Sequence, residues 1–194
     1  MFDINLNDMR DNAANHLNTS CYCITLNRTQ LQQALQADAL NQDVLTSLPQ
    51  LFSNTSVFIS PAHAEEMQGI ISAVTRVVKL PGYLQRVLAD APNIASNASG
   101  AEGVFMGYDF HMSEQGPKII EINTNAGGAF LNAALLSAQT ECCRAAGMLL
   151  PKLKTHLETE FMDMFLQEWA LQRKDKTLKV IAIVDENPQQ QFLY

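Results

Sequence analysis

The sequence predicts an α/β or α+β fold in which helices pack around a mostly antiparallel sheet. Three patterns support this prediction. Two segments of alternating apolar residues, 104–112 and 118–123, flank a polar turn and predict a β-hairpin. Apolar residues recur at helical spacing in residues 61–80 and 151–173. A nearly all-apolar run at 179–185 is typical of a parallel strand covered on both faces.

Composition excludes several classes of function. The chain has 194 residues and is 47% hydrophobic and 17% charged, values that are typical of ordered globular domains. The net charge of -7 argues against nonspecific binding to nucleic acid or to an anionic membrane, because such binding needs clustered Lys and Arg. The sequence has no apolar run of about 18 residues that would span a membrane, and no signal-peptide pattern. We therefore expect a cytoplasmic protein.

Cysteine usage indicates neither a disulfide scaffold nor a zinc site. The four cysteines are Cys21, Cys23 and the adjacent pair Cys142 and Cys143. They are too sparse for a disulfide framework in a chain of this length. Neither pair has the spacing of a Cys₄ zinc site. We therefore expect reduced thiols.

Short elements are predicted before residue 60. A helix ends near residue 20, and residues 20–26 have the pattern of a short strand. Asn27 or Thr29 is then expected to cap a helix that runs to residue 35. Residues 38–51 carry a weaker helical pattern.

The middle of the chain predicts two helices and a long loop. Pro61 suits the first position of a helix whose apolar residues recur through Leu80. Pro81 and Gly82 end that helix, and a short helix follows at residues 83–89. Residues 93–103 are rich in Asn, Ser, Ala and Gly and predict a connecting loop.

Two helices and a boundary are predicted after the hairpin. Residues 129–147 are rich in Ala and Leu and predict a largely buried helix. Residues 151–173 predict an amphipathic helix with an apolar residue at every fourth position: Leu153, Leu157, Phe161, Phe165 and Trp169. Residues 173–179 are basic and polar, so we place a domain boundary there, with parts 1–173 and 174–194.

The apolar run at 179–185 predicts the first strand of a second α/β domain. A strand buried on both faces needs parallel neighbours and a crossover helix, and few residues follow it. This pattern favours a chain that forms the N-terminal part of a longer protein. The alternative is that the strand joins the first sheet as its last member.

The hairpin brings acidic side chains together. Side chains alternate across a strand, so Gly107, Asp109 and His111 share one face of the first strand. Ile119, Glu121 and Asn123 are expected to share a face of the second strand, and Lys118 the opposite face. With a turn centred on Gln115, Asp109 lies directly opposite Glu121.

This pair predicts a cation site. Like charges opposite each other on a sheet are destabilising, unless they are exposed to solvent, one carboxyl is protonated, or a cation lies between them. Two carboxylates and an amide oxygen are hard ligands of the kind that Mg²⁺ accepts. Asn125 to Gly128 form a flexible loop before an apolar helix, and backbone N–H groups there suit an anion. The alternative is a solvated hairpin face followed by a Gly-rich turn.

The same residues carry a resemblance to a known superfamily. Asp109-Phe110, then Lys118-Ile119-Ile120-Glu121-Ile122-Asn123 and a loop of small residues, resemble the metal-binding segment of ATP-grasp ligases. The order is most similar to that of glutathionylspermidine-synthase-like and circularly permuted ATP-grasp proteins. Those relatives often carry Arg two residues before the Asp, where this chain has Gly107. Phosphate neutralisation is then expected from another residue.

The resemblance implies both a site and a reaction. Asp109, Glu121 and Asn123 would hold Mg²⁺ that bridges the phosphates of ATP. The loop after the hairpin would lie near the transferred phosphate, with these residues as candidates: Thr124, Asn125, Gly127 and Gly128. The implied reaction activates a carboxylate as an acyl phosphate, which an amine then attacks; the substrate is a small molecule or a peptide. Because the lysines and the adenine pocket of such sites have no obvious counterpart here, we expect these 194 residues alone to be inactive.

Two alternatives remain open at this stage. The chain is either a ligase portion or a non-catalytic binding or assembly module with a degenerate ATP-grasp-like site, for which Gly107 is the best support. A metal-dependent phosphohydrolase using the same carboxylates is a weaker third option. The sequence contains no G-x-S-x-G, G-x-x-x-x-G-K-[ST] or G-x-G-x-x-G motif, so triad hydrolases, P-loop proteins and Rossmann sites are not indicated.

Overall fold

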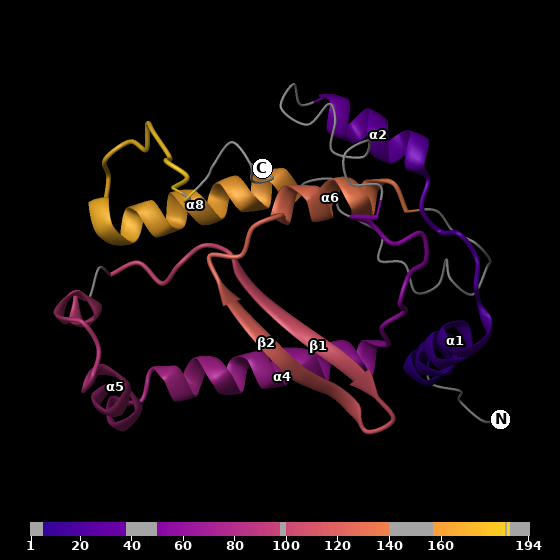
Figure 1. Ribbon diagram of the computed structural model, residues 1–194, viewed down its shortest axis with the longest axis horizontal. Coiled ribbons are helices and arrows are strands. Elements are labelled where there is room, and N and C mark those ends of the chain that lie inside the picture. Colours follow the sequence, from indigo (N-terminus) through magenta and orange to yellow (C-terminus); the bar gives the residue numbers. More distant parts are fainter. Residues whose placement is uncertain (1–5, 38–49, 98–99, 140–156, 185, 187–194) are drawn as a thin grey trace. The chain divides into compact units, whose positions relative to one another are not determined.

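A computed structural model describes residues 6–37, 50–97, 100–139, 157–184 and 186 of the chain (Figure 1). Within these residues it contains six α-helices and one two-stranded antiparallel sheet. The mixed helix and sheet content is that of an α+β protein, as the sequence predicted. No helix in the described ranges combines the length and the apolar character that a membrane span requires.

The elements follow one another along the chain with labels as in Figure 1. Their bounds are α1 Leu6–Ser20, α2 Arg28–Ala37, α4 Pro61–Val78, α5 Pro81–Leu88, the 3₁₀-helix η1 Asn93–Ser96, β1 Met106–Ser113, β2 Gly116–Thr124, α6 Ala129–Ser137 and α8 Leu157–Arg173. Two compact units divide them. Unit 1 comprises Met1–Pro61, Ala126–Phe161 and Ile181–Tyr194, and unit 2 comprises Ala62–Asn125 and Met162–Val180.

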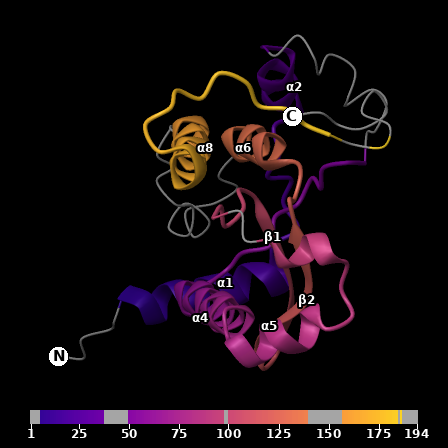
Figure 2. The same cartoon turned by 90° about the vertical axis from the view of Figure 1, so that its left-hand side faces the viewer.

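Unit 1 has a core between α2 and α6, which lie side by side (Figure 1 and Figure 2). The buried side chains of this core are Leu26, Leu31, Leu35, Phe52, Leu131 and Ala138. Gln30 Nε2 donates to the Ser137 carbonyl at 2.9 Å, and Leu26 forms an isolated bridge with Gln139. The apolar stripe of α2 is thereby covered, as the helical spacing of its leucines requires.

A second cluster of unit 1 anchors the segment before α4 to α1. Ala14, Leu17 and Phe58 are buried together. Asn18 donates from Nδ2 to the Phe58 carbonyl at 2.7 Å, and Asn18 Oδ1 accepts from the Phe58 N–H at 2.8 Å. One amide side chain therefore satisfies both backbone groups of Phe58, as buried backbone requires.

The start of α2 confirms one sequence prediction and contradicts another. Asn27 Oδ1 accepts from the Gln30 N–H at 3.0 Å, so Asn27 is the cap that its type predicted. The predicted strand at 20–26 is wrong, because α1 runs through Ser20 and the segment forms no ladder. Its backbone groups bond to two separate segments: Thr25 N–H to the Asn54 carbonyl and Asn27 N–H to the Ala138 carbonyl, each at 3.0 Å.

Unit 2 contains α4, α5, the hairpin and the greater part of α8. Pro61 begins α4 as predicted, and the helix ends at Val78, two residues before the predicted Leu80. Pro81 occupies the first turn of α5, so its missing N–H costs no helical hydrogen bond. Glu66 of α4 reaches the hairpin turn, since a Cβ added to Gly116 would lie 2.6 Å from Glu66 Oε2. Gly116 also has φ of 94°, which favours glycine.

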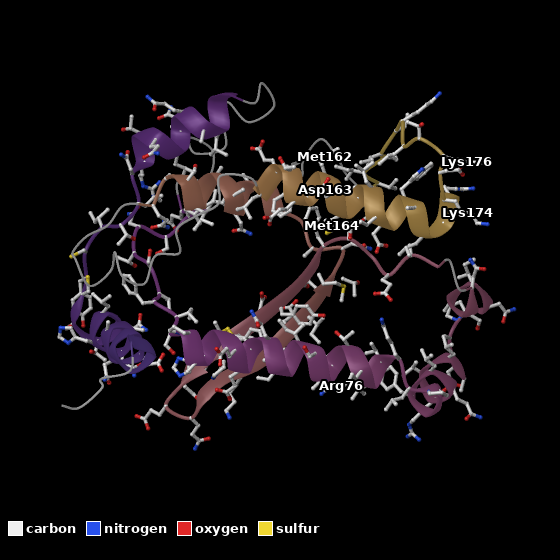
Figure 3. All side chains as sticks on the ribbon, turned by 180° about the vertical axis from the view of Figure 1, so that it is seen from behind. Arg76, Met162, Asp163, Met164, Lys174 and Lys176 are labelled. Atoms are coloured by element: carbon white, nitrogen blue, oxygen red, sulfur yellow. The ribbon has the colours of Figure 1, made fainter. Side chains whose placement is uncertain are left out.

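The loop before the hairpin is fixed to α8 by one carboxylate. Glu168 Oε2 accepts from the N–H groups of Glu102 at 2.8 Å and Gly103 at 3.0 Å. The rings of Phe105 and Phe165 meet edge to face at 5.6 Å. The residues that follow α8 are also held, because the Trp169 indole N–H donates to the Lys176 carbonyl. Figure 3 marks Met162 to Met164 on α8 and Lys174 and Lys176 past its end.

The predicted strand at 179–185 is wrong for the residues that are described. Residues 179–184 form neither a strand nor a helix, and Val180 and Val184 are 78% and 90% exposed. The predicted helix at 129–147 is shorter than expected, because α6 ends at Ser137 and residues 138 and 139 are not helical. Predictions for 38–49, 140–156, 185 and 187–194 lie outside the described residues, including most of the helical pattern at 38–51, Leu153 and residues 140–147. The proposed boundary at 173 and 174 stays a prediction.

Candidate metal and nucleotide site on the hairpin

The hairpin places Asp109 directly opposite Glu121, as predicted. Gly107 lies opposite Asn123, so the three candidate metal ligands share one face of the sheet. The turn is tighter than expected, because Ser113 pairs with Gly116. Its hydroxyl accepts from the Gln115 N–H at 3.2 Å and donates to the Gly116 carbonyl at 2.8 Å. This closed turn fixes the register as far as Phe110 and Ile119, and the acidic pair lies beyond that point.

A β-bulge interrupts the ladder beside the acidic pair. The register shifts between Asp109 and Phe110, so that Phe110 pairs with Ile119 and Ile120 has no opposite residue on β1. Beyond the bulge His111 pairs with Lys118. Two predictions were therefore wrong. Ile119 shares the face of Phe110 instead of that of Glu121, and Lys118 shares the face of Asp109 and Glu121.

Side-chain burial agrees with this assignment of the two faces. On the first face, Asp109, His111, Lys118, Glu121 and Asn123 are all exposed. On the second face, the half-buried side chains are those of Tyr108, Phe110, Met112 and Ile119. Ile120 is 69% exposed, as expected of an extra residue outside the regular alternation. Met106 and Ile122, near the open end of the same face, are 42% and 40% exposed.

The bulge has a physical cause that the sequence contains. Ile119 and Ile122 are three residues apart, so strict alternation would place them on opposite faces. One extra residue between them allows both to join the apolar face. The consecutive residues Ile119 and Ile120, between polar Lys118 and Glu121, are the signal that identifies the break.

The acidic pair offers oxygen donors of the kind that Mg²⁺ accepts, but too few to fill all of its coordination positions. In the described part of the chain no Lys, Arg or His nitrogen lies within 4.0 Å of Asp109 or Glu121. Nor do the described residues group three side chains of the Asp, Glu, His and Cys types so as to hold a metal ion. Mg²⁺ commonly takes one or two carboxylates and keeps several waters or phosphate oxygens. The two carboxylates and the Asn123 amide oxygen fit that pattern.

The candidate phosphate loop spans the division between the two units. Thr124 and Asn125 close unit 2 and are exposed, and Asn125 has φ of 54°. Gly127 and Gly128 belong to unit 1. Gly128 precedes α6 with φ of 82° and provides no side-chain cap. The structure thus groups Asp109, Glu121 and Asn123 on one face, together with Lys118, which the sequence analysis had placed on the opposite face.

Comparison with known proteins identifies no relative. No protein-family model, no curated protein and no solved structure matches the chain. The functional argument therefore rests on the hairpin residues, their register and their charges.

Proposed function

We propose that the hairpin is the metal-binding element of an ATP-grasp-like carboxylate–amine ligase. The observation that supports this proposal best is the direct cross-strand pairing of Asp109 with Glu121, with Asn123 next on the same exposed face. The order and spacing of these residues resemble the metal-binding segment of the superfamily. An exposed face leaves room for a nucleotide to supply the remaining oxygen ligands.

Each hairpin residue then has a defined task. Asp109 and Glu121 hold the cation with charged oxygens, and Asn123 adds a neutral one. A bound Mg²⁺ would supply charge neutralisation at the phosphates of ATP. Thr124, Asn125, Gly127 and Gly128 are proposed to bind phosphate oxygens through backbone N–H groups, which short side chains leave accessible.

The proposed reaction has two balanced displacements. A substrate carboxylate oxygen attacks the γ-phosphorus of ATP, and ADP leaves with the electron pair of the broken bond. An amine then attacks the carbonyl carbon of the acyl phosphate, the carbon–oxygen bond to phosphate breaks, and inorganic phosphate leaves with the electron pair and takes up the proton that the amine loses as the amide forms. The protein's contribution to such a reaction is mostly positioning and electrostatic stabilisation.

The first test measures binding of Mn²⁺, as a spectroscopic substitute for Mg²⁺, by electron paramagnetic resonance. In the double variant Asp109→Asn with Glu121→Gln, we expect the affinity for Mn²⁺ to fall about tenfold or more, because both charged ligands are lost. The matched control is Glu160→Gln with Asp163→Asn, which removes two exposed acids from α8. Equal Mn²⁺ affinities in the wild type and in the hairpin double variant would refute the metal site.

A non-catalytic binding module is the second candidate, and Gly107 favours it. The ATP-grasp proteins that this segment resembles often have Arg at this position, and a glycine opposite Asn123 brings no charge to the phosphates. Such a module would show no Mg²⁺-dependent affinity for ATP, whereas the ligase portion should show it. A phosphohydrolase would release phosphate from ATP without any amine acceptor, so the same titration followed by a phosphate assay separates all three.

A further inference from the structure

Lys118 is placed beside the acidic pair by the bulge. We infer that Lys118 binds the phosphate groups of the nucleotide at this face, replacing the positive charge that Gly107 lacks. This inference rests on the proposed function and assigns a phosphate-binding residue to the same site. Regular alternation would have turned Lys118 to the apolar face, so only the observed register supports this role.

The register places the Lys118 ammonium within range of the proposed metal position. Lys118 lies opposite His111, which is two residues from Asp109 on the same strand and face. Lys118 and Asp109 are thus diagonal neighbours, and such neighbours, about 7–8 Å apart, are within reach of long side chains. Four methylene groups separate its ammonium from the backbone, so the charge can reach a ligand that extends from the acidic pair along the strands.

Charge balance on this face favours an anionic ligand for Lys118. Asp109 and Glu121 together cancel the double charge of one Mg²⁺, which leaves Lys118 as the net positive charge toward a triphosphate. In the described part of the chain, Lys118 forms no ion pair with either carboxylate or with Glu66 near the turn. Its ammonium is therefore not used to neutralise these acids.

The other basic side chains described in unit 2 either form contacts of their own or lie on elements other than the hairpin. Lys79 pairs with Glu102 at 2.8 Å, and the Arg173 guanidinium lies 5.8 Å from the centre of the Trp169 ring. Figure 3 shows Arg76 on α4 and Lys174 and Lys176 past the end of α8. Lys118 and His111 are the basic residues of the hairpin itself, and of these two residue types lysine is the usual phosphate contact, where it acts as a point charge.

The test compares two ligands in three variants of the 194-residue chain. Binding of Mn²⁺ alone and binding of ATP in the presence of Mg²⁺ are measured for Lys118→Met, Lys118→Arg and the control Lys174→Met. We expect Lys118→Met to weaken ATP binding about tenfold, as loss of one charge-assisted contact does. Binding of Mn²⁺ alone should be unchanged or tighter, because a like charge near the metal is removed. Lys118→Arg should restore ATP binding, and Lys174→Met should change neither affinity.

A loss of affinity for ATP without a loss of affinity for Mn²⁺ distinguishes a phosphate contact from a structural role. If Lys118→Met weakens Mn²⁺ and ATP binding equally, Lys118 supports the hairpin and the inference is wrong. If Lys118→Met leaves ATP binding unchanged while Asp109→Asn with Glu121→Gln abolishes it, the inference fails and the proposed function stands. Absence of Mg²⁺-dependent ATP binding in the wild-type chain would remove both.

Discussion

Single residues decide what the hairpin face can bind, but they contribute little to its stability. Asp109 and Glu121 are exposed, so water and salt screen their repulsion. Such a pair is tolerated without a cation, and it would act as a pair of ligands when a cation binds. The pairing of Asp109 with Glu121 was predicted from a turn centred on Gln115 and an unbroken ladder, whereas the structure reaches it through a tighter turn, in which Ser113 pairs with Gly116, and one bulge residue. The two differences offset each other at this pair. The proposed cation does not follow from the pairing, since the spacing of oxygen donors alone does not identify the ion.

The Asn27 cap is a single-residue prediction that concerns stability in unit 1. Replacing Asn27 by Ala removes the acceptor for the Gln30 N–H and should lower the free energy of unfolding by about 1 kcal/mol. The backbone bond from Asn27 to Ala138 remains in the variant, so the effect isolates the side chain. Urea denaturation measures it, and Asn27→Asp serves as the control that keeps a capping oxygen. A loss as large in the Asp variant would contradict the capping role.

At the scale of elements, the sequence predicted features that depend on residues near one another in the chain and missed features that depend on pairing with another strand. The hairpin, the helix start at Pro61 and the half-buried stripe of α8 follow from alternation, ring geometry and four-residue spacing. The short helix predicted at 83–89 begins two residues earlier, at Pro81. The bulge was missed because strict alternation was assumed through two consecutive isoleucines. The strand at 179–184 was wrong for a related reason: an apolar run indicates a tendency to be buried, but a strand also needs a neighbouring edge.

The bulge can be tested by replacing Ile119 and Ile120 separately with Lys. Ile119 is half-buried on the apolar face and Ile120 is 69% exposed. Ile119→Lys should therefore lower the free energy of unfolding by about 1–2 kcal/mol, whereas Ile120→Lys should change it by less than about 0.5 kcal/mol. An unbroken ladder that keeps Asp109 opposite Glu121 predicts the reverse order, because Ile120 would then lie opposite Phe110 on the apolar face. Thermal denaturation of the two variants, which have the same charge, distinguishes the registers.

At the scale of the whole molecule, the described buried core and the candidate ligands belong to different units. The buried hydrophobic residues lie in unit 1: Ala14, Leu17, Leu26, Leu31, Leu35, Phe52, Phe58, Leu131 and Ala138. The described helices of unit 2, α4, α5 and most of α8, contain no buried residue. Elements with few buried apolar contacts open at lower free energy. Unit 2 is thus the part of the described chain in which a ligand has the most to stabilise.

Hydrogen exchange should therefore respond to nucleotide mainly in the hairpin. With Mg²⁺ and ATP at about ten times the dissociation constant, hairpin amides that open only after the ligand leaves should exchange about tenfold more slowly. Amides of α2 should not change, because local opening around Leu31 and Leu35 need not release a ligand held on β1 and β2. The variant Asp109→Asn with Glu121→Gln should remove the effect in the hairpin at the same ATP concentration. If ATP slows exchange in α2 but does not slow it in the hairpin, the nucleotide binds elsewhere. The acidic pair would then lie on a solvated face without a ligand.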